Sequence, residues 1–202
     1  MTSHAVGKTG PQVILATSFL KQFFLHPFEV GSMLPSSKWL ANEMLDGLPT
    51  KSFKSVVEYG PGNGSFTNIL NAQLTDDAQL VAVEPNEYFA EQIKKQFPNA
   101  IVAMDYAERV SQYLGDNRGN VDLVVSGLPF SLMDWDTVER TIYETAQILK
   151  PGGHFRTFFY CHMNYYWKIK ELKALLNKSF SETSYDCVLR NFPPAFVIKC
   201  KK

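Results

Sequence analysis

The chain has 202 residues, of which 45% are hydrophobic and 20% are charged, and its formal net charge is zero. These values predict a single globular protein with a sizeable core. Its three cysteines lack metal-ligand spacing and are too few for a disulfide framework, which favours a reducing, cytoplasmic setting. The chain has neither the ~20-residue apolar run that spans a bilayer nor an export signal, so we expect it to be neither transmembrane nor exported.

Basic residues are concentrated in the C-terminal quarter. Residues 150–202 contain ten Lys or Arg and three acids, a local charge of +7 in a chain that is neutral overall. Such a region could meet phosphate on a nucleic acid or on a lipid head group. A solvated helix face with a frayed tail would explain the same charges, since charge runs usually face solvent.

The predicted elements begin with a helix over 11–25 and a second helix from about 37 to 45. Strands then alternate with helices. The strands are expected near 55–59, 80–84, 100–104, 121–126, 154–160, 183–190 and 195–200. The helices between them are expected near 66–73, 86–96, 107–114, 134–149 and 165–177. This alternation predicts an α/β fold with a doubly wound, seven-stranded, mainly parallel sheet, an antiparallel last strand and N-terminal helices.

The strongest functional signal is a glycine-rich turn. The apolar strand 55–59 includes Glu58 and runs into Gly60, Gly62 and Gly64 on alternate positions. Glycines allow backbone angles and close approaches that a Cβ would block, and Ser or Thr after them can cap a helix whose N-terminus faces a ligand. An ordinary strand-to-helix connection is the alternative interpretation.

Two further strands also end in an acid. Glu84 follows the second strand about 20 residues after the glycines, where a carboxylate can bind the hydroxyls of a ribose. Asp105 follows the third strand and could receive the amino group of an adenine. Glu58, directly ahead of the glycines, would repel a pyrophosphate but suits the ammonium of a methionine moiety. The pattern therefore favours S-adenosylmethionine over NAD.

These acids and glycines resemble the cofactor motifs of the class I S-adenosylmethionine-dependent methyltransferases, which have a Rossmann-like fold. The resemblance implies that S-adenosylmethionine is the methyl donor and S-adenosylhomocysteine the product, with no metal. The residues expected to bind the cofactor are Ser37, Glu58, Tyr59, Gly60, Gly62, Gly64, Glu84, Pro85, Asp105, Tyr106, Ser126 and Gly127.

The segment 126–130, Ser-Gly-Leu-Pro-Phe, follows the fourth strand, where the acceptor should meet the methyl group. It resembles the Asn-Leu-Pro-Tyr segment of ribosomal RNA adenine dimethyltransferases, except that Gly127 stands in place of the Asn that holds the adenine amino group. Nucleobase methylation therefore loses support. RNA adenine N6-methylation, small-molecule amine N-methylation and a non-catalytic cofactor-binding protein stay open as alternatives.

Four stretches resemble the bacterial phospholipid N-methyltransferases, which make phosphatidylcholine from phosphatidylethanolamine. They are residues 19–27, 30–37, 126–129 and 190–197. The resemblance implies methyl transfer to the amino head group of a phospholipid such as phosphatidylethanolamine, by an enzyme peripherally associated with the cytoplasmic membrane face. The partner is then a lipid surface rather than a nucleic acid; the sequence predicts no oligomeric state.

A membrane-facing helix is predicted near the N-terminus. Its apolar stripe consists of Ala16, Phe19, Leu20, Phe23 and Phe24. Such a helix can lie in the membrane interface or simply pack onto the sheet. We expect residues 1–50 to form an N-terminal helical segment that serves as a membrane or substrate lid, and residues 51–202 to form the methyltransferase domain.

Catalysis requires a neutral amine aligned with the S–CH3 bond, and a primary amine has a pKa near 10, so it must first lose a proton. Candidate proton acceptors are Tyr160, His162 and Tyr106, each of which could instead fill a core or surface role. An aromatic surround for the methylated ammonium could come from Phe130, Tyr160, Tyr165, Tyr166 and Trp167. An ordinary core would explain these aromatics equally well. The predicted catalytic residues are Tyr160, His162 and Phe130.

Overall fold

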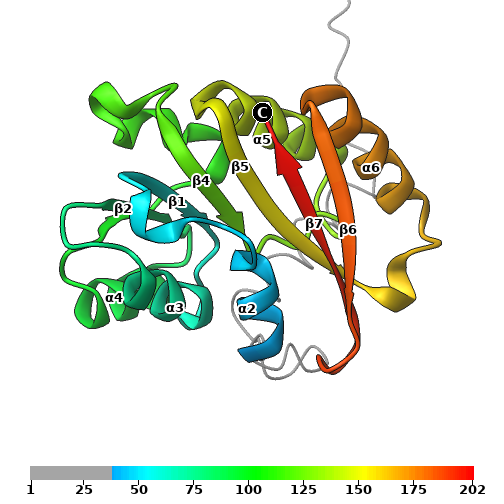
Figure 1. Cartoon of the computed structure of the whole chain (residues 1–202), viewed down its shortest axis with the longest axis horizontal. Helices are drawn as coiled ribbons and strands as arrows, with labels where there is room; N and C mark the ends of the chain where they lie inside the picture. The colour runs from blue at the N-terminus through cyan, green and yellow to red at the C-terminus, as the bar shows by residue number, and fades with distance from the viewer. Residues whose placement is uncertain (1–37) are drawn as a thin grey trace, which may run out of the picture.

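The computed structural model describes residues 38–202, which form one seven-stranded sheet with helices on both faces (Figure 1). The strand order is β3-β2-β1-β4-β5-β7-β6. The strands are β1 (Ser55–Tyr59), β2 (Gln79–Val83), β3 (Ile101–Ala103), β4 (Val121–Ser126), β5 (Leu149–Tyr160), β6 (Glu182–Val188) and β7 (Ala195–Lys201). The first five strands are parallel, whereas β7 is antiparallel to both β5 and β6. The predicted α/β class, strand number and antiparallel last strand are confirmed.

The α-helices connect the strands nearly as the sequence predicts. They are α2 (Lys38–Leu45), α3 (Ser65–Gln73), α4 (Glu87–Gln96), α5 (Trp135–Ile148) and α6 (Trp167–Ser179). Side-chain caps begin two of them: Asn86 accepts from the Phe89 N–H at 3.2 Å and Asp134 from the Thr137 N–H at 2.9 Å. The predicted helix over 11–25 lies outside the described residues.

Four short 3₁₀ helices complete the described elements: η1 (Thr50–Ser52), η2 (Ala107–Tyr113), η3 (Gly115–Asn117) and η4 (Cys161–Met163). An α-helix was expected over 107–114, and this expectation is wrong. Gly115 follows with a φ of 52°, in the left-handed region, and interrupts this connection between β3 and β4; 3₁₀ turns are frequent as connectors.

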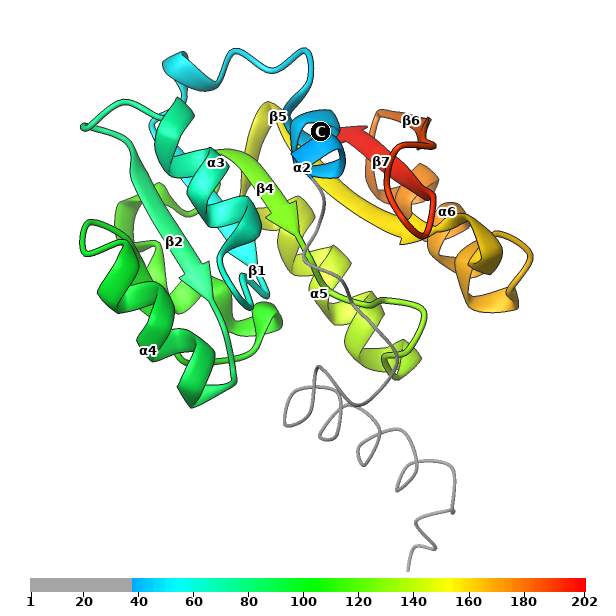
Figure 2. The same cartoon turned by 90° about the horizontal axis from the view of Figure 1, so that it is seen from below.

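The alternation of side chains along the strands divides the core between the two faces of the sheet. One face packs under α2 and α3, with Val56 and Leu123 in its cluster. The other packs under η2, α5 and α6, with Val57 and Val124 in its cluster. Figure 2 shows α3 and α5 on opposite sides of the sheet. The carboxyl ends of the parallel strands lie together at one edge of the sheet, where ligands bind in such folds.

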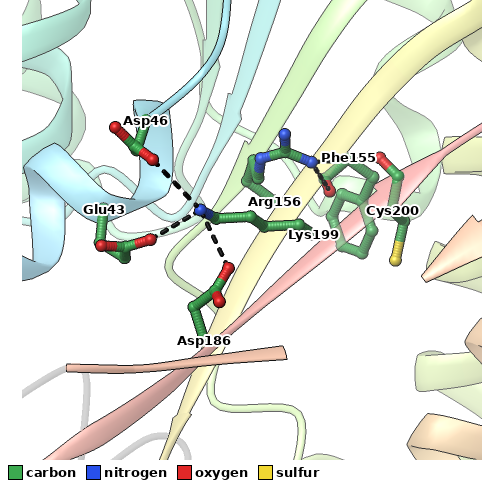
Figure 3. A network of polar contacts seen from close by, with 7 residues as sticks. All are labelled: Glu43, Asp46, Phe155, Arg156, Asp186, Lys199 and Cys200. Carbon is green, nitrogen blue, oxygen red and sulfur yellow. Dashed lines mark hydrogen bonds and ion pairs between the residues drawn. The ribbon is translucent and has the colours of Figure 1, made fainter. Parts of the chain in front are cut away.

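An ion network holds α2 against the sheet (Figure 3). Lys199 Nζ on β7 lies 2.6 Å from Glu43 Oε1 of α2, 3.0 Å from Asp186 Oδ2 of β6 and 3.7 Å from Asp46 Oδ2. Burial works against the charge of Lys199, but the hydrogen bonds to Glu43 and Asp186 outweigh it and raise its pKa. Beside it, buried Arg156 donates to the carbonyl of Cys200 at 3.3 Å. The network holds α2 against β6 and β7.

Only part of the predicted N-terminal segment 1–50 can be placed. Its described part includes α2, whose Leu40 and Met44 are fully buried against the sheet. The boundary at residue 50 and the lid role stay predictions. Among residues 38–202, no helix has both the length and the apolar character needed to cross a membrane.

Candidate functional site

The glycine-rich turn after β1 has the backbone conformation that its sequence predicts. Gly60, Gly62 and Gly64 all have positive φ values, 64°, 53° and 82°. The turn is tied to its neighbours by main-chain bonds, because the Gly60 N–H donates to the Val83 carbonyl and the Gly127 N–H donates to the Tyr59 carbonyl, each at 2.9 Å. The turn therefore lies between the carboxyl ends of β2 and β4.

Two glycines have opposite steric roles. A Cβ added to Gly62 would meet nothing within 4 Å, so open space adjoins the backbone there. A Cβ on Gly127 would lie 2.9 Å from the Gly60 carbonyl oxygen, closer than real Cβ atoms come. Gly62 therefore leaves room for a ligand, whereas Gly127 allows the segment after β4 to pack against the turn. No Asn, nor any other side chain, fits at position 127 without moving this backbone.

The helix α3 begins directly at the turn without a side-chain cap. Gly64 is its N-cap residue, and Asn63 Oδ1 instead accepts from the N–H and Oγ of Ser65 at 3.3 and 2.7 Å. The expected cap by Ser or Thr is wrong, because Ser65 is already the first helical residue and Thr67 is fully buried. An uncapped helix N-terminus presents N–H groups and a partial positive charge to a ligand.

Glu58 is a fully buried carboxyl group at the base of this turn. Neither of its oxygens has a hydrogen-bond partner at normal geometry among the described residues, and the Thr67 hydroxyl is in the same condition. Burial raises the pKa of Glu58 to about 8, although the nearby Thr67 hydroxyl and N–H oppose the shift. A buried carboxyl without a partner is costly, and a cationic group would relieve it. The site thus fits the ammonium end of S-adenosylmethionine.

Glu84, directly after β2, holds the turn in place. Its Oε2 accepts from the Gly62 N–H at 3.1 Å and its Oε1 from the Asn86 N–H at 2.9 Å. Burial raises its pKa, and the two amide bonds only partly oppose this. The acid predicted to bind a ribose is therefore also a structural brace for the glycine turn, with Pro85 next to it in the chain.

Asp105 follows β3 and already has partners in its own chain. Its Oδ1 accepts from the Tyr106 N–H at 2.7 Å and its Oδ2 from the Tyr113 hydroxyl at 3.0 Å. The hydrogen bond to Asp105 raises the pKa of Tyr113. Met104 and Tyr106, on either side of this acid, are exposed. The sequence gives no sign of the Tyr113 contact, which occupies one carboxylate oxygen of Asp105.

On the acceptor side, Tyr160 ends β5 and lies against His162. The two rings are stacked, with centroids 5.9 Å apart and planes 8° apart. Burial raises the pKa of Tyr160, so its phenol stays protonated at neutral pH and is a poor proton acceptor. Tyr106 lies beyond β3, four strand spacings or about 19 Å of sheet away. The structure thus brings together two of the three predicted proton acceptors and separates the third.

The predicted aromatic surround is only partly assembled. Phe130 is buried in the core, whereas Tyr165 and Trp167 are exposed. A different set of rings encloses an ammonium group: Lys173 Nζ lies 5.0 Å from the ring centre of Phe159, 4.9 Å from Tyr185 and 5.9 Å from Phe196. Sequence reasoning missed this set because its three rings come from three separate strands and the lysine from α6.

The remaining predicted residues have clear positions. Ser126 is fully buried at the end of β4, and its Oγ accepts from the Leu128 N–H at 3.2 Å. Tyr59 is buried beneath the turn, with its hydroxyl 3.3 Å from that of Thr145. Ser37 lies outside the described residues. Within residues 38–202, no group of three or more His, Cys, Asp or Glu could hold a metal ion.

Residues 56–153 match the family model described as a methyltransferase domain. This chain carries an S-adenosylmethionine-dependent methyltransferase domain. The match spans β1 through the first part of β5, which includes the glycine turn, Glu84, Asp105 and Gly127. The predicted enzyme class and cofactor are thereby confirmed.

Individual methyltransferases extend the likeness beyond this domain. An ornithine lipid N-methyltransferase of Singulisphaera acidiphila is 28% identical over 189 residues, which cover 91% of this chain and 94% of that protein. A ribosomal RNA large subunit methyltransferase G of Shewanella amazonensis is 29% identical over 142 residues, 65% of this chain but 36% of that protein. The likeness to the lipid enzyme is therefore the more extensive.

Solved methyltransferases share the fold. The crystal structure of the Burkholderia thailandensis 1,6-didemethyltoxoflavin-N1-methyltransferase, with its acceptor and S-adenosylhomocysteine bound, has a TM-score of 0.67 to this chain. The alignment covers 100% of this chain and 93% of that chain at 14% identity. At this identity the likeness concerns the fold alone.

Proposed function

We propose that this methyltransferase transfers methyl groups to the primary amine in the head group of a membrane lipid. The observation that carries the proposal is the near full-length likeness to an ornithine lipid N-methyltransferase. The site supports it, because Gly127 offers no side chain to hold a planar nucleobase amine and leaves no room for one. Phosphatidylethanolamine, expected from the sequence, and ornithine lipid both present a primary aliphatic amine, and both are proposed acceptors.

The cofactor half of the site is proposed to work through the residues of three strand ends. S-adenosylmethionine supplies an activated methyl group on a sulfonium. Glu58, buried and without a partner, would receive the ammonium of the methionine moiety, and Glu84 would bind the ribose while bracing the Gly62 N–H. Asp105 would face the adenine amino group. Together, these contacts would orient the methyl-bearing sulfonium of the cofactor toward the segment after β4.

The acceptor half is proposed to use the end of β5. His162 would accept the proton that the amine must lose, since the Tyr160 phenol is held in its protonated form by burial. The face of Tyr160 would contact the amine as it gains methyl groups and positive charge. Phe130, buried after β4, would shape the pocket wall rather than contact the amine.

We also propose that the enzyme works at the cytoplasmic membrane face as a peripheral protein, with the predicted helix over 11–25 as one membrane contact. RNA methylation is the second candidate, favoured by the partial likeness to the ribosomal RNA enzyme. It is disfavoured by Gly127 and by the shorter share of that protein that matches.

A direct assay would compare acceptors. The purified protein would be incubated with methyl-labelled S-adenosylmethionine and, separately, with phosphatidylethanolamine vesicles, ornithine lipid vesicles and total RNA. We expect label in one or both lipids, and none with a Gly62→Val variant, whose side chain enters the open space beside the turn. Label in RNA with none in either lipid would overturn the proposal.

A further inference from the structure

Large apolar side chains are exposed mainly along one edge of this molecule. Three segments at that edge form what we call the aromatic rim: the start of α2, the segment 161–167 after β5, and the hairpin 189–194 between β6 and β7. The exposed apolar residues of the rim are Trp39, Tyr165, Tyr166, Trp167, Leu189 and Phe192.

The three segments of the rim are neighbours in space. Tyr160 at the end of β5 pairs with Ala195, which pairs with Val188, so the hairpin lies beside the end of β5. The Cys161 N–H donates to the Pro194 carbonyl at 2.8 Å. The guanidinium of Arg190 lies 4.7 Å from the ring centre of Trp39, which joins the hairpin to α2. Figure 1 shows the start of α2 and the hairpin at the same end of the molecule.

This edge is also the edge of the candidate site. The parallel strands β1, β4 and β5 all end there, with the glycine turn after β1 and Tyr160 at the end of β5. Elsewhere on the described residues, away from the carboxyl ends of the strands, only Ile101 and Tyr143 are exposed large apolar residues. The concentration of apolar surface is therefore tied to the opening where an acceptor would enter.

Three residues of the rim are the most exposed large apolar side chains among residues 38–202. Tyr165 is 85% exposed, Phe192 78% and Leu189 76%. Single exposed apolar residues are common on protein surfaces, but a contiguous set marks an interaction site. Trp and Tyr are the residues that prefer the boundary between water and a bilayer, because their rings are apolar and their polar ends can stay hydrated.

The charge around the rim complements an anionic surface. Residues 160–170 and 187–202 contain no Asp or Glu. Next to the rim, these stretches contain Lys168, Lys170 and Arg190; the lysines of β7 lie at the opposite end of the sheet, where Lys201 pairs with His154. Basic residues next to a membrane surface gain from the negative potential of anionic lipids, whereas acidic residues would be repelled.

The rim is held in a fixed shape by contacts behind it. The Lys199 network in Figure 3 anchors α2, and with it Trp39, across β6 and β7. In the hairpin, buried Asn191 donates to the Pro193 carbonyl at 2.6 Å. Asn164 accepts from Lys173 Nζ at 2.7 Å, so the ammonium enclosed by Phe159, Tyr185 and Phe196 also secures the segment after β5.

We propose that the aromatic rim is a docking face for an anionic lipid bilayer. On docking, the side chains of Leu189, Phe192 and Tyr165 insert into the bilayer, and the opening of the candidate site faces the lipid head groups. The proposal rests on the proposed function for its choice of partner. It differs from the predicted membrane contact of residues 11–25, because it uses only side chains of residues 38–202.

The test is cosedimentation of the full chain with vesicles of phosphatidylethanolamine and phosphatidylglycerol. A Leu189→Ser/Phe192→Ser double variant and a Tyr165→Ser variant should each bind vesicles at least about 10-fold more weakly than the unmodified chain. The matched control is Tyr143→Ser on α5, a tyrosine that is 66% exposed away from the rim; it should bind normally. Circular dichroism and S-adenosylmethionine affinity should be unchanged in all three.

The outcomes separate docking from function. Rim variants that bind vesicles as well as the Tyr143→Ser control would overturn the docking proposal, whatever the enzyme methylates. Rim variants that keep vesicle binding but shift a dimer to monomer in sedimentation would also overturn it, because the rim would then contact a second copy. Loss of vesicle binding in rim variants of a protein that methylates no lipid would support docking and refute the proposed function.

Discussion

Glu84 Oε2 accepts a hydrogen bond of 3.1 Å from the N–H of Gly62, which ties the acid after β2 to the glycine turn after β1. One carboxylate therefore sets the shape of the turn and is also the group proposed to bind the ribose of the cofactor. Because its other oxygen accepts from Asn86, Glu84 also fixes the start of α4. Cofactor affinity and local stability should consequently depend on the same side chain.

Replacing Glu84 by Ala should weaken S-adenosylmethionine binding by about 10-fold or more, since a charge-assisted hydrogen bond contributes about 1.5–3 kcal/mol. It should also lower the free energy of unfolding by about 1–3 kcal/mol, because two backbone N–H groups lose their acceptor. Calorimetric titration and urea denaturation measure the two effects. Glu91→Ala, on the exposed face of α4, is the control; an equal effect of both substitutions would contradict the role of Glu84.

Gly62→Ala and Gly115→Ala form a matched pair. The two glycines have φ values of 53° and 52°, and an added Cβ would meet nothing within 4 Å at either position. Both substitutions should cost about 1–2 kcal/mol of stability from the left-handed backbone. Only Gly62→Ala should lose cofactor affinity, because only that Cβ enters the space beside the turn. Equal affinity of the two variants, measured by calorimetry, would remove the cofactor from this turn.

The raised pKa of Glu58 predicts a pH dependence of stability. Without cofactor, the folded chain keeps the Glu58 proton up to about pH 8, whereas the unfolded chain loses it near its ordinary value of 4.5. The folded state therefore binds more protons in this window, and its stability falls as pH rises from 4.5 to 8. The cost reaches as much as about 4 kcal/mol at pH 8.

Glu58→Gln should remove this dependence. The variant should be more stable than the unmodified chain at pH 8, and the difference should shrink toward pH 5. Urea denaturation at pH 5, 6.5 and 8 without cofactor would show it. If the free energy of unfolding depends on pH in the same way in both proteins, the pKa of Glu58 is not raised, which would contradict a buried Glu58 carboxyl that lacks a hydrogen-bond partner.

The two residues at the end of β5 should differ in their kinetic effects. His162→Ala should lower kcat by about 100-fold or more if His162 accepts the amine proton. Tyr160→Phe keeps the aromatic face and should have a small effect. Tyr160→Leu removes that face and should impair the second and third methyl transfers more than the first, because a methylated ammonium gains most from a ring. Mass spectrometry of the mono-, di- and trimethylated products distinguishes these cases, and an unchanged kcat in His162→Ala would exclude its role.

The features that could be predicted from the sequence are those that depend on a local pattern of residues. Apolar strands with Glu58, Glu84 and Asp105 at or just after their ends, and glycines after the first, were enough to predict the carboxyl edge of the sheet and the identity of the cofactor. The start of β5 was predicted at 154, but the strand begins at Leu149. The Pro151-Gly152-Gly153 segment has the composition of a turn, yet a Cβ on Gly153 would lie 2.9 Å from the carbonyl of Val121, so glycine permits close pairing with β4.

What the sequence could not predict depends on contacts between distant segments. The bond between Gly62 and Glu84, the Tyr113 hydroxyl on Asp105 and the rings around Lys173 each join residues from different elements. The aromatic rim also depends on contacts between distant segments. Trp39 and Arg190 are far apart in the chain, and only the pairing of β5, β7 and β6 brings the hairpin to the start of α2.

The measurement that tests the central claim most directly is mass spectrometry of total lipids from a bacterial host that lacks N-methylated lipids. The unmodified chain and its Gly62→Val variant would be expressed at equal levels in this host, with an ornithine lipid pathway present and absent. The account predicts lipids heavier by one, two or three methyl groups on the head-group amine, only with the unmodified chain. An unchanged lipid profile, with S-adenosylmethionine binding intact and methyl groups appearing in ribosomal RNA, would contradict it.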